Sequence, residues 1–98
     1  MSDITFEWDK RKGSLNERKH NVSFEEAQTV FTDERALFIN DPDHSKDEDR
    51  FILLGLSNRL RVLLVSHCYR EGDRVIRIIS ARKAAPSEQK QYWNRWYL

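Results

Sequence analysis

The sequence has a single cysteine and no long apolar segment. Cys68 lies in the apolar run of residues 62–69, so it cannot form a disulfide within the chain and is expected to pack as a small hydrophobic side chain. No apolar stretch approaches the roughly 18 residues of a membrane-spanning helix, and the first residues lack the basic and apolar segments of a signal peptide. We therefore expect a cytoplasmic protein that is neither exported nor embedded in a membrane.

The chain also lacks internal repeats, linkers and low-complexity segments. Its 98 residues leave too little interior for a second hydrophobic core beside the first. Hydrophobic residues make up 39% of the sequence, which suffices for a core, and charged residues make up 34%, which predicts a densely charged surface. We expect one folded domain over residues 1–98.

The net charge is only +1, but the charges are unevenly distributed. Residues 1–49 carry seven Lys/Arg against thirteen Asp/Glu, a balance of −6, whereas residues 50–98 carry ten against three, a balance of +7. If the basic half forms one face, it can hold a phosphate backbone, with binding that is weak and sensitive to salt. A solvated sheet edge without a partner is the alternative.

A short strand over residues 4–8 is followed by two predicted helices. The first begins at about Lys10, where Asp9 can cap it, and ends near residues 19–21, where basic side chains suit the negative end of the helix dipole. The second begins after Ser23, because Ser23 and Glu26 have the spacing of a capping box, in which each side chain bonds the backbone of the other residue. Its expected buried stripe consists of Phe24, Ala27, Val30 and Phe31.

The rest of the chain is typical of a sheet with a final helix. A short strand is predicted over residues 36–39, and three longer ones over residues 51–57, 60–69 and 75–81. The tight connections between the longer strands indicate an antiparallel meander. Pro86 suits the first turn of a helix that reaches about Arg95. We expect an α+β fold in which two N-terminal helices and a C-terminal helix pack on an antiparallel β-sheet.

Three blocks of the sequence carry a resemblance to a known family. The first block consists of Phe6, Glu7, Trp8, Asp9, Lys12, Asn16, Lys19, His20, Val22, Phe24, Glu25, Glu26, Ala27, Val30 and Phe31. The second consists of His44, Ser45, Glu48, Arg50, Leu54, Gly55 and Ser57, and the third of residues 77–84 with Glu88 and Tyr92. Taken together and in this order, the blocks resemble the BrnT family of toxins.

The resemblance implies a RelE-like fold and a ribonuclease that arrests translation by cutting RNA. It also implies a cognate antitoxin similar to BrnA, which neutralises the toxin and whose own DNA-binding part represses the shared operon. DNA would then be bound only indirectly, through the antitoxin. We expect no cofactor.

Four arginines on or beside the long strands are the candidate catalytic cations: Arg50, Arg61, Arg77 and Arg82. Cutting RNA without a metal requires a base for the 2′-OH proton, cations for the charged intermediate and an acid for the leaving oxygen. The planar guanidinium binds two phosphate oxygens and stays charged. Arg77, in the middle of an apolar strand, is expected either at the site or in an ion pair. Alternation places Arg77 and Arg82 on opposite faces unless the strand ends or bulges between them. For Arg61, simple exposure at the strand start is the alternative.

His44 and Glu48 are the candidate acid and base, because they lie in a loop beside the sheet. An ion pair between Glu48 and Arg50 is the alternative to catalysis. The candidate RNA-binding residues are Lys19, His20, Lys83 and Tyr92. Contact with the helix dipole also explains Lys19 and His20, and the aromatic tail could equally cover the sheet or dock an antitoxin helix. His67 is expected to be a packed core histidine.

The acidic loop does not predict a metal site, because it lacks calcium-loop spacing. Its residues are Asp41, Asp43, His44, Asp47, Glu48 and Asp49. Two functions other than RNA cleavage remain open at this point. One is a non-enzymatic module that uses the basic sheet surface to bind an antitoxin or RNA without cutting it. The other is direct DNA binding, which the lack of a helix-turn-helix or basic-helix signal disfavours.

Overall fold

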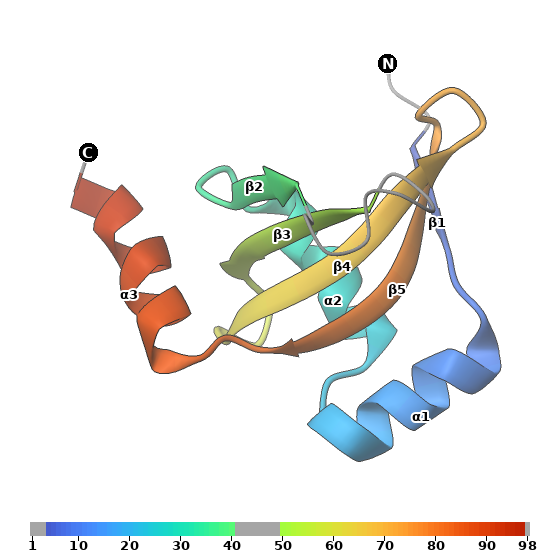
Figure 1. Ribbon diagram of the computed structural model, residues 1–98, viewed down its shortest axis with the longest axis horizontal. Coiled ribbons are helices and arrows are strands. Elements are labelled where there is room, and N and C mark those ends of the chain that lie inside the picture. Colours follow the sequence, from blue (N-terminus) through green and yellow to red (C-terminus); the bar gives the residue numbers. More distant parts are fainter. Residues whose placement is uncertain (1–3, 41–49, 98) are drawn as a thin grey trace.

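The computed structural model describes residues 4–40 and 50–97, and Figure 1 shows its arrangement. The elements are β1 (Thr5–Glu7), α1 (Lys10–His20), α2 (Phe24–Thr29), η1 (Val30–Thr32), β2 (Leu37–Asn40), β3 (Phe51–Leu56), β4 (Val62–Arg70), β5 (Val75–Lys83), α3 (Pro86–Asn94) and η2 (Arg95–Tyr97). This order confirms the α+β prediction. Within the described residues, no helix is both long enough and apolar enough to cross a membrane.

Local signals set where the first two helices begin. Asp9 caps α1 by accepting a hydrogen bond from the Lys12 backbone N–H at 3.1 Å, and Asn21 ends the helix at a φ of 58°. Ser23 caps α2 by accepting from the Glu26 backbone N–H at 3.0 Å. The second half of the predicted capping box is wrong: the Glu26 carboxylate accepts from Ser57 Oγ at 2.7 Å and from Arg61. A buried charge takes the stronger, cationic partner.

The strands form one sheet in the order β1-β5-β4-β3-β2. The strands β2 to β5 pair in antiparallel fashion with their neighbours, which confirms the predicted meander. The first strand, β1, pairs in parallel with β5, with Glu7 opposite Arg77. This pairing joins the start of the chain to its last strand and brings a carboxylate of the acidic half beside a basic strand.

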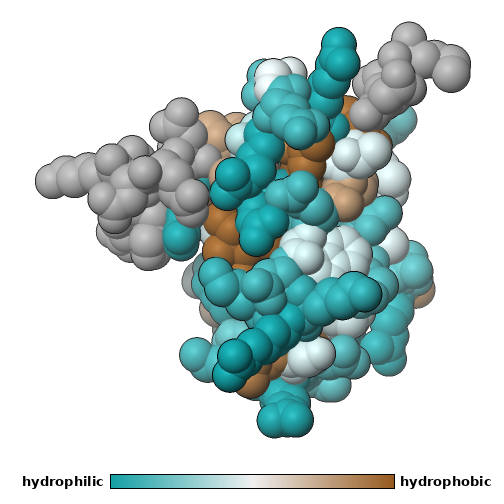
Figure 2. Space-filling model, turned by 90° about the vertical axis from the view of Figure 1, so that its right-hand side faces the viewer, coloured by the Kyte–Doolittle hydropathy of each residue, from teal (hydrophilic) through white to brown (hydrophobic). Residues whose placement is uncertain are grey.

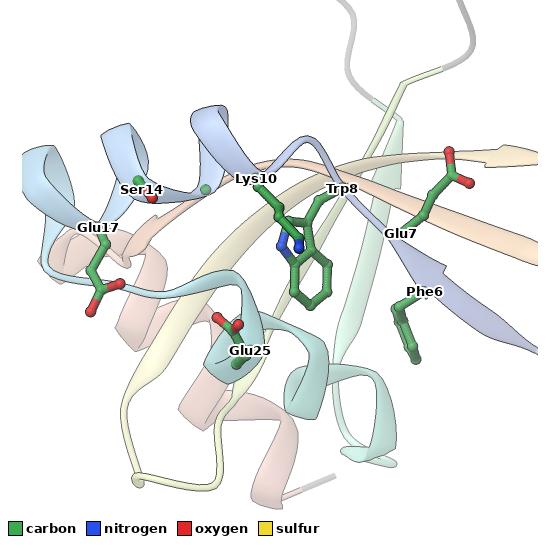
Figure 3. A pocket seen from close by; sticks show the side chains of 8 residues that line it. Phe6, Glu7, Trp8, Lys10, Ser14, Glu17 and Glu25 are labelled. Atoms are coloured by element: carbon green, nitrogen blue, oxygen red, sulfur yellow. The ribbon is translucent and has the colours of Figure 1, made fainter.

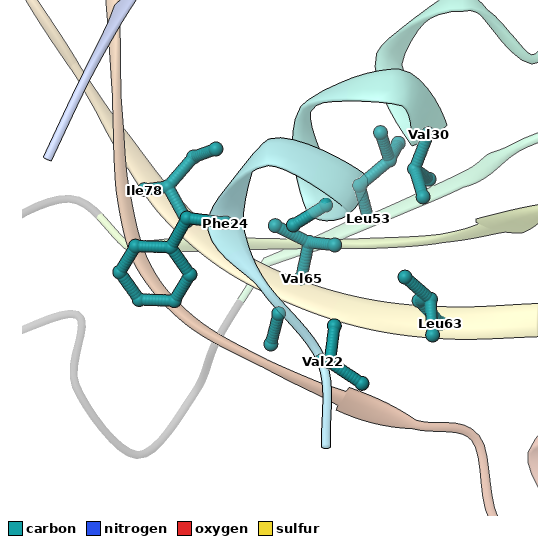
Figure 4. Close-up of a cluster of buried hydrophobic side chains, with 9 residues drawn as sticks. Val22, Phe24, Val30, Leu53, Leu63, Val65 and Ile78 are labelled. Atoms are coloured by element: carbon teal, nitrogen blue, oxygen red, sulfur yellow. The ribbon is translucent and has the colours of Figure 1, made fainter. Parts of the chain in front are cut away.

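The main core lies on one face of the sheet, which we call the helix face. α1 and α2 pack against β5, and η1 packs against β3 (Figure 1). Figure 4 shows the buried side chains between them, which are Val22, Phe24, Ala27, Val30, Leu53, Leu63, Val65, Ile78 and Ala81. A Cβ on Gly55 would lie 2.8 Å from Val30 Cγ1 and 2.9 Å from Ala36 Cβ, so glycine permits this close approach of η1 to β3.

We call the opposite side of the sheet the open face. At one end, α3 covers it through a second apolar cluster of Leu54, Val62, Ala84 and Tyr92. The end beside β1 is not covered by a helix of the described chain (Figure 1). A helix-covered face and a partly uncovered face explain why these strands are apolar on both sides in sequence.

A β-bulge in β5 places Arg77 and Arg82 on the same face. Ser66 pairs with Ser80 and His67 pairs with Ile78, so Ile79 is an extra residue that shifts the alternation. Ile78 and Ala81, three residues apart, therefore both enter the core on the helix face. Arg77 and Arg82 pair with Cys68 and Leu64, four residues apart on β4, which separates them by about 13 Å along the strand.

Candidate functional site

A cationic pocket lies at the uncovered end of the open face. It has a volume of about 180 Å³ and is lined by Asp9, Lys12, Arg50, Cys68, Arg70, Arg77, Ile78 and Ile79. We use "cationic pocket" for this site. Arg50 leads into β3, Arg70 ends β4 and Arg77 lies on β5, so the meander brings three guanidinium groups together. Four cations and one carboxylate line the pocket, so it attracts an anion such as a phosphate.

Glu7 holds two of these arginines from the neighbouring strand. Its Oε2 accepts a hydrogen bond from Arg77 Nη1 at 2.7 Å and lies 3.8 Å from Arg70 Nε. The Arg77 side chain is 31% exposed and that of Glu7 is 42% exposed, so the pair remains open to solvent. Arg77 is therefore both paired and at the pocket, although the sequence suggested these as alternatives. None of Glu7, Arg70 and Lys12 was a candidate site residue in the sequence, although Glu7 and Lys12 belong to the first block.

Asp9 connects α1 to the same pocket. The hydrogen bond from the Lys12 backbone, opposed by burial and aided by further contacts with Arg11, Lys12 and Arg77, lowers the pKa of Asp9 below its usual value. The carboxylate thus stays charged while it fixes the first turn of α1, from which Lys12 reaches the pocket. Asp9 and Lys12 both belong to the first sequence block. In the sequence, helix capping was sufficient to explain Asp9, so a second role at the pocket was not predicted.

Arg61 lies in a separate contact, not in the cationic pocket. Its Nε donates to Glu26 Oε2 at 2.9 Å, and its Nη2 donates to the Asn21 carbonyl at 3.0 Å and to Glu26 Oε1. Burial raises the pKa of Glu26, but the bonds from Arg61 and Ser57 outweigh it and hold that pKa below its usual value. This pairing gives Arg61 a structural contact outside the cationic pocket, and its catalytic role stays a prediction.

Arg82 faces the open side but is engaged by α3. Its Nη1 and Nη2 donate to the two carboxylate oxygens of Glu88 at 2.8 and 2.9 Å. This pairing raises the pKa of Arg82 and lowers that of Glu88. Glu88 also accepts from the Ala85 backbone N–H at 2.7 Å, so a carboxylate caps α3 where no hydroxyl is present. The Arg82 side chain is still 41% exposed and can meet a ligand that extends along β5.

Tyr92 does not bind RNA by stacking in this structure, because it is fully buried. Its hydroxyl donates to Asp33 Oδ2 at 2.6 Å, and burial followed by this contact raises the pKa of Tyr92 to about 12. Tyr92, a member of the third sequence block, is therefore a packing residue. The exposed aromatic side chains of the tail are Trp93, Trp96 and Tyr97, and Arg35 lies 4.4 Å over the Trp96 ring.

The remaining candidates are scattered or lie outside the described residues. Lys19 and Lys83 are exposed, but neither lines the cationic pocket. His20 is half-buried at the end of α1. His44 and Glu48, with the rest of the acidic loop, lie outside the described residues, so their catalytic roles and the prediction of no metal site stay predictions. His67 is fully buried on the helix face, as expected for a core histidine.

A larger hollow beside Trp8 has the wrong charge for a phosphate. It has a volume of about 480 Å³ and is lined by Phe6, Glu7, Trp8, Lys10, Gly13, Ser14, Glu17 and Glu25 (Figure 3). Its three carboxylates outnumber its single lysine, so an anion is repelled there. Figure 2 shows the molecule from the side of β1 and α1, where the surface is mostly hydrophilic.

Comparisons with known proteins agree with the fold and the sequence blocks. A family model described as "Ribonuclease toxin, BrnT, of type II toxin-antitoxin system" matches residues 8–88. The chain is similar to the crystal structure of the Brucella abortus ribonuclease toxin, BrnT, with a TM-score of 0.65 and 23% identity. That match covers 84% of this chain and 97% of the other. No curated protein matches the chain.

Proposed function

The chain belongs to the BrnT family of ribonuclease toxins of type II toxin–antitoxin systems, and we propose that it cleaves RNA at the cationic pocket. The observation that carries this assignment is the convergence of Arg50, Arg70 and Arg77 on one pocket of the open face. Arginines bind two phosphate oxygens at once and stay charged throughout a reaction. The pocket therefore has the charge that stabilises a phosphate as negative charge develops on it.

The proposed reaction is a transfer within the RNA that needs no metal ion. The 2′-oxygen attacks the adjacent phosphorus and the bond from phosphorus to the 5′-oxygen breaks, which leaves a 2′,3′-cyclic phosphate and a 5′-hydroxyl. A base takes the 2′-OH proton, and an acid gives a proton to the leaving 5′-oxygen. We propose His44 and Glu48 for these two proton transfers.

Within the pocket, Arg77 is the proposed main electrostatic catalyst. The 2.7 Å bond to Glu7 fixes the orientation of the Arg77 guanidinium, and its remaining N–H groups can face a phosphate. Arg50, Arg70 and Lys12 add positive charge around the same phosphate. Arg82, farther along β5, would contact the RNA beyond the bond that is cut. Lys19, His20 and Lys83 would add surface charge for the rest of the strand.

We further propose that the cleaved RNA is messenger RNA, that cleavage arrests translation in the cytoplasm, and that a BrnA-like antitoxin neutralises the toxin. The support is the family to which the chain belongs. An antitoxin that blocks the pocket must cover several arginines, so it has to present complementary negative charge. DNA would be reached only through the antitoxin.

The decisive experiment incubates purified protein with end-labelled RNA in EDTA, with and without ribosomes. We expect cleavage in EDTA and a fragment ending in a 2′,3′-cyclic phosphate. Activity that disappears in EDTA and returns with Mg²⁺ would contradict the metal-independent mechanism. Binding of RNA with no cleavage under any of these conditions would favour a non-enzymatic binding module.

A further inference from the structure

An aromatic pocket lies on the helix face, beyond the area that η1 covers. It has a volume of about 550 Å³, and the described residues that line it are Phe38, Phe51, Tyr69 and Asp73. We use "aromatic pocket" for this site. We propose that it receives an arginine side chain of a partner protein. This inference does not depend on RNA cleavage, because it concerns the opposite face of the sheet.

The rings present the surface that a guanidinium stacks on. Phe38 and Phe51 are stacked, with ring centroids 5.1 Å apart and an interplanar angle of 29°, and Phe51 and Tyr69 lie 5.7 Å apart. Phe38 is 49% exposed, although it is a large apolar residue on the edge strand β2. Aromatic faces carry negative quadrupole charge and attract cations, arginine more often than lysine.

Among the described residues that line the pocket, the charged one is the carboxylate Asp73. Asp73, in the turn between β4 and β5, is exposed, and no Lys or Arg of the described chain forms an ion pair with it. Asp73 and Tyr69 line the same pocket, and burial, followed by the charge of Asp73, raises the pKa of Tyr69. The pocket therefore has an unneutralised negative charge at its rim.

His67 packs against these rings from inside the protein and does not itself line the aromatic pocket. Its ring contacts Phe38, Phe51 and Tyr69, with centroids 5.9, 6.2 and 5.4 Å away. Nδ1 lies 3.3 Å from the Val65 carbonyl, so Nδ1 is assigned the proton and Nε2 is an acceptor. Among the described residues, Nε2 is the buried side-chain polar atom without a hydrogen-bond partner. Burial lowers the pKa of His67 to about 4, so the ring is neutral and does not repel a cation.

These features distinguish an arginine from the other ligands that stack on aromatic rings. A nucleotide brings a phosphate, which Asp73 repels. A purely apolar side chain leaves the carboxylate without a partner. A guanidinium supplies a planar face, a positive charge and five N–H donors in one group.

The test follows the aromatic ring signals of the full chain by nuclear magnetic resonance during titration with the peptide acetyl-Gly-Arg-Gly-amide. The matched probe carries citrulline, which has nearly the same shape and no charge. We expect saturable shifts of the Phe38, Phe51 and Tyr69 rings with the arginine peptide and weak, non-saturating shifts with citrulline.

Two turn variants separate a specific carboxylate from general negative charge. Asp73→Asn is expected to weaken binding of the arginine peptide by about tenfold, because it removes a charge-assisted hydrogen bond. Asn tolerates the φ of 69° at this position, so the fold is kept. The control is Glu71→Gln, an exposed carboxylate in the same turn, whose variant should bind within about twofold of the original chain.

Three results would overturn the proposal. Equal binding of the arginine and citrulline peptides would show that the pocket does not recognise the positive charge of the guanidinium. Equal losses in Asp73→Asn and Glu71→Gln would show general electrostatic attraction only. Saturation of the same ring signals by cytidine or adenosine 5′-monophosphate, without saturation by the arginine peptide, would identify a base-stacking site instead.

Discussion

At the scale of single residues, charged and polar side chains in apolar surroundings define the chemistry of this protein. Arg77 and His67 lie on adjacent strands of the sheet and on opposite faces. Glu7 and solvent compensate the charge of the Arg77 guanidinium. His67 has neither, and burial lowers its pKa to about 4. The face that each residue occupies therefore decides whether a charge on it can be compensated.

Replacing Arg77 should separate the role of charge from that of guanidinium geometry. We expect Arg77→Ala to lower the RNA cleavage rate by about a hundredfold, as for the loss of one electrostatic catalyst. Arg77→Lys keeps the charge but loses the planar fork, so a loss of about tenfold is expected. Single-turnover cleavage assays give both values.

The matched control for Arg77 is Arg18→Ala, which removes an exposed arginine of α1 outside the cationic pocket. Its cleavage rate should stay within about twofold of the original chain. Circular dichroism of all variants checks the fold. A folded Arg77→Ala variant with full activity would show that Arg77 is a structural residue.

His67 should make stability depend on pH in the mildly acidic range. Its pKa is about 4 in the folded state against an ordinary value of 6.5, so the unfolded chain binds the proton first. Stability is therefore highest above pH 6.5 and falls as the pH drops towards 4, by about 3 kcal/mol in total. Urea unfolding at a series of pH values measures this loss.

The control for this prediction is His67→Leu, which keeps an apolar side chain at the buried position. Its free energy of unfolding should change little between pH 6.5 and 4.5. Glu26 and Glu88 have lowered pKa values, so their protonation reduces the free energy of unfolding only at still lower pH, and it does so in both proteins. Parallel curves for the two proteins over the whole range would mean that His67 is protonated without cost.

At the scale of elements, two ion pairs attach helices to the sheet, and they differ in burial. Arg61 joins the start of β4 to α2 through Glu26, whose side chain is 3% exposed. Arg82 joins β5 to α3 through Glu88, and these two side chains are 41% and 25% exposed. A buried carboxylate that loses its partner is far more costly than an exposed one.

We therefore expect Arg61→Ala to lower the free energy of unfolding by about 3 kcal/mol. Arg82→Ala should lower it by less than about 1 kcal/mol. Glu26→Gln in the Arg61→Ala background should recover part of the loss, because no buried charge is then left without a partner. Chemical denaturation measures all three. An unchanged stability of Arg61→Ala together with lost cleavage would instead support the predicted catalytic role of Arg61.

At the scale of the whole molecule, the two faces of the sheet are assigned different partners. The helix face holds the core and, at one end, the aromatic pocket. The open face holds the cationic pocket at the end that α3 leaves free. Because the domain is small, we propose that RNA and a neutralising antitoxin compete for this remaining surface.

Competition for the open face can be measured with the Arg77→Ala chain, which is expected to cleave the RNA probe only slowly. We expect its complex with the antitoxin to lose RNA binding, because the antitoxin covers Arg50 and Arg82 with acidic or aromatic side chains. Fluorescence anisotropy of labelled RNA, recorded with the free chain and with the complex at one salt concentration, reports the difference. Undiminished RNA binding by the complex would show that the sites are separate and that inhibition is allosteric.

The sequence by itself determined the features that depend on neighbouring residues. Capping by Asp9 and Ser23, the proline at the start of α3 and the tight turns of the meander act over a few residues, so they can be read directly from the chain. The family resemblance could also be recognised from the sequence, because the three blocks are patterns of residues at fixed positions along the chain. Arg50 and Arg77 were also found from the sequence, because an arginine on or beside an apolar strand requires an explanation.

Only the tertiary structure decided which distant residues meet. The parallel pairing of β1 with β5 places Glu7 beside Arg77, seventy residues later, and no local signal records that contact. The bulge at Ile79 reverses the face that simple alternation gives to Arg82. Tyr92, a candidate RNA contact in the sequence, is buried and packs in the core. Glu26 binds Arg61 instead of the backbone N–H that the predicted capping box would give it. Pairing, burial and charge compensation depend on residues far along the chain, so they are settled when the sheet and helices pack together.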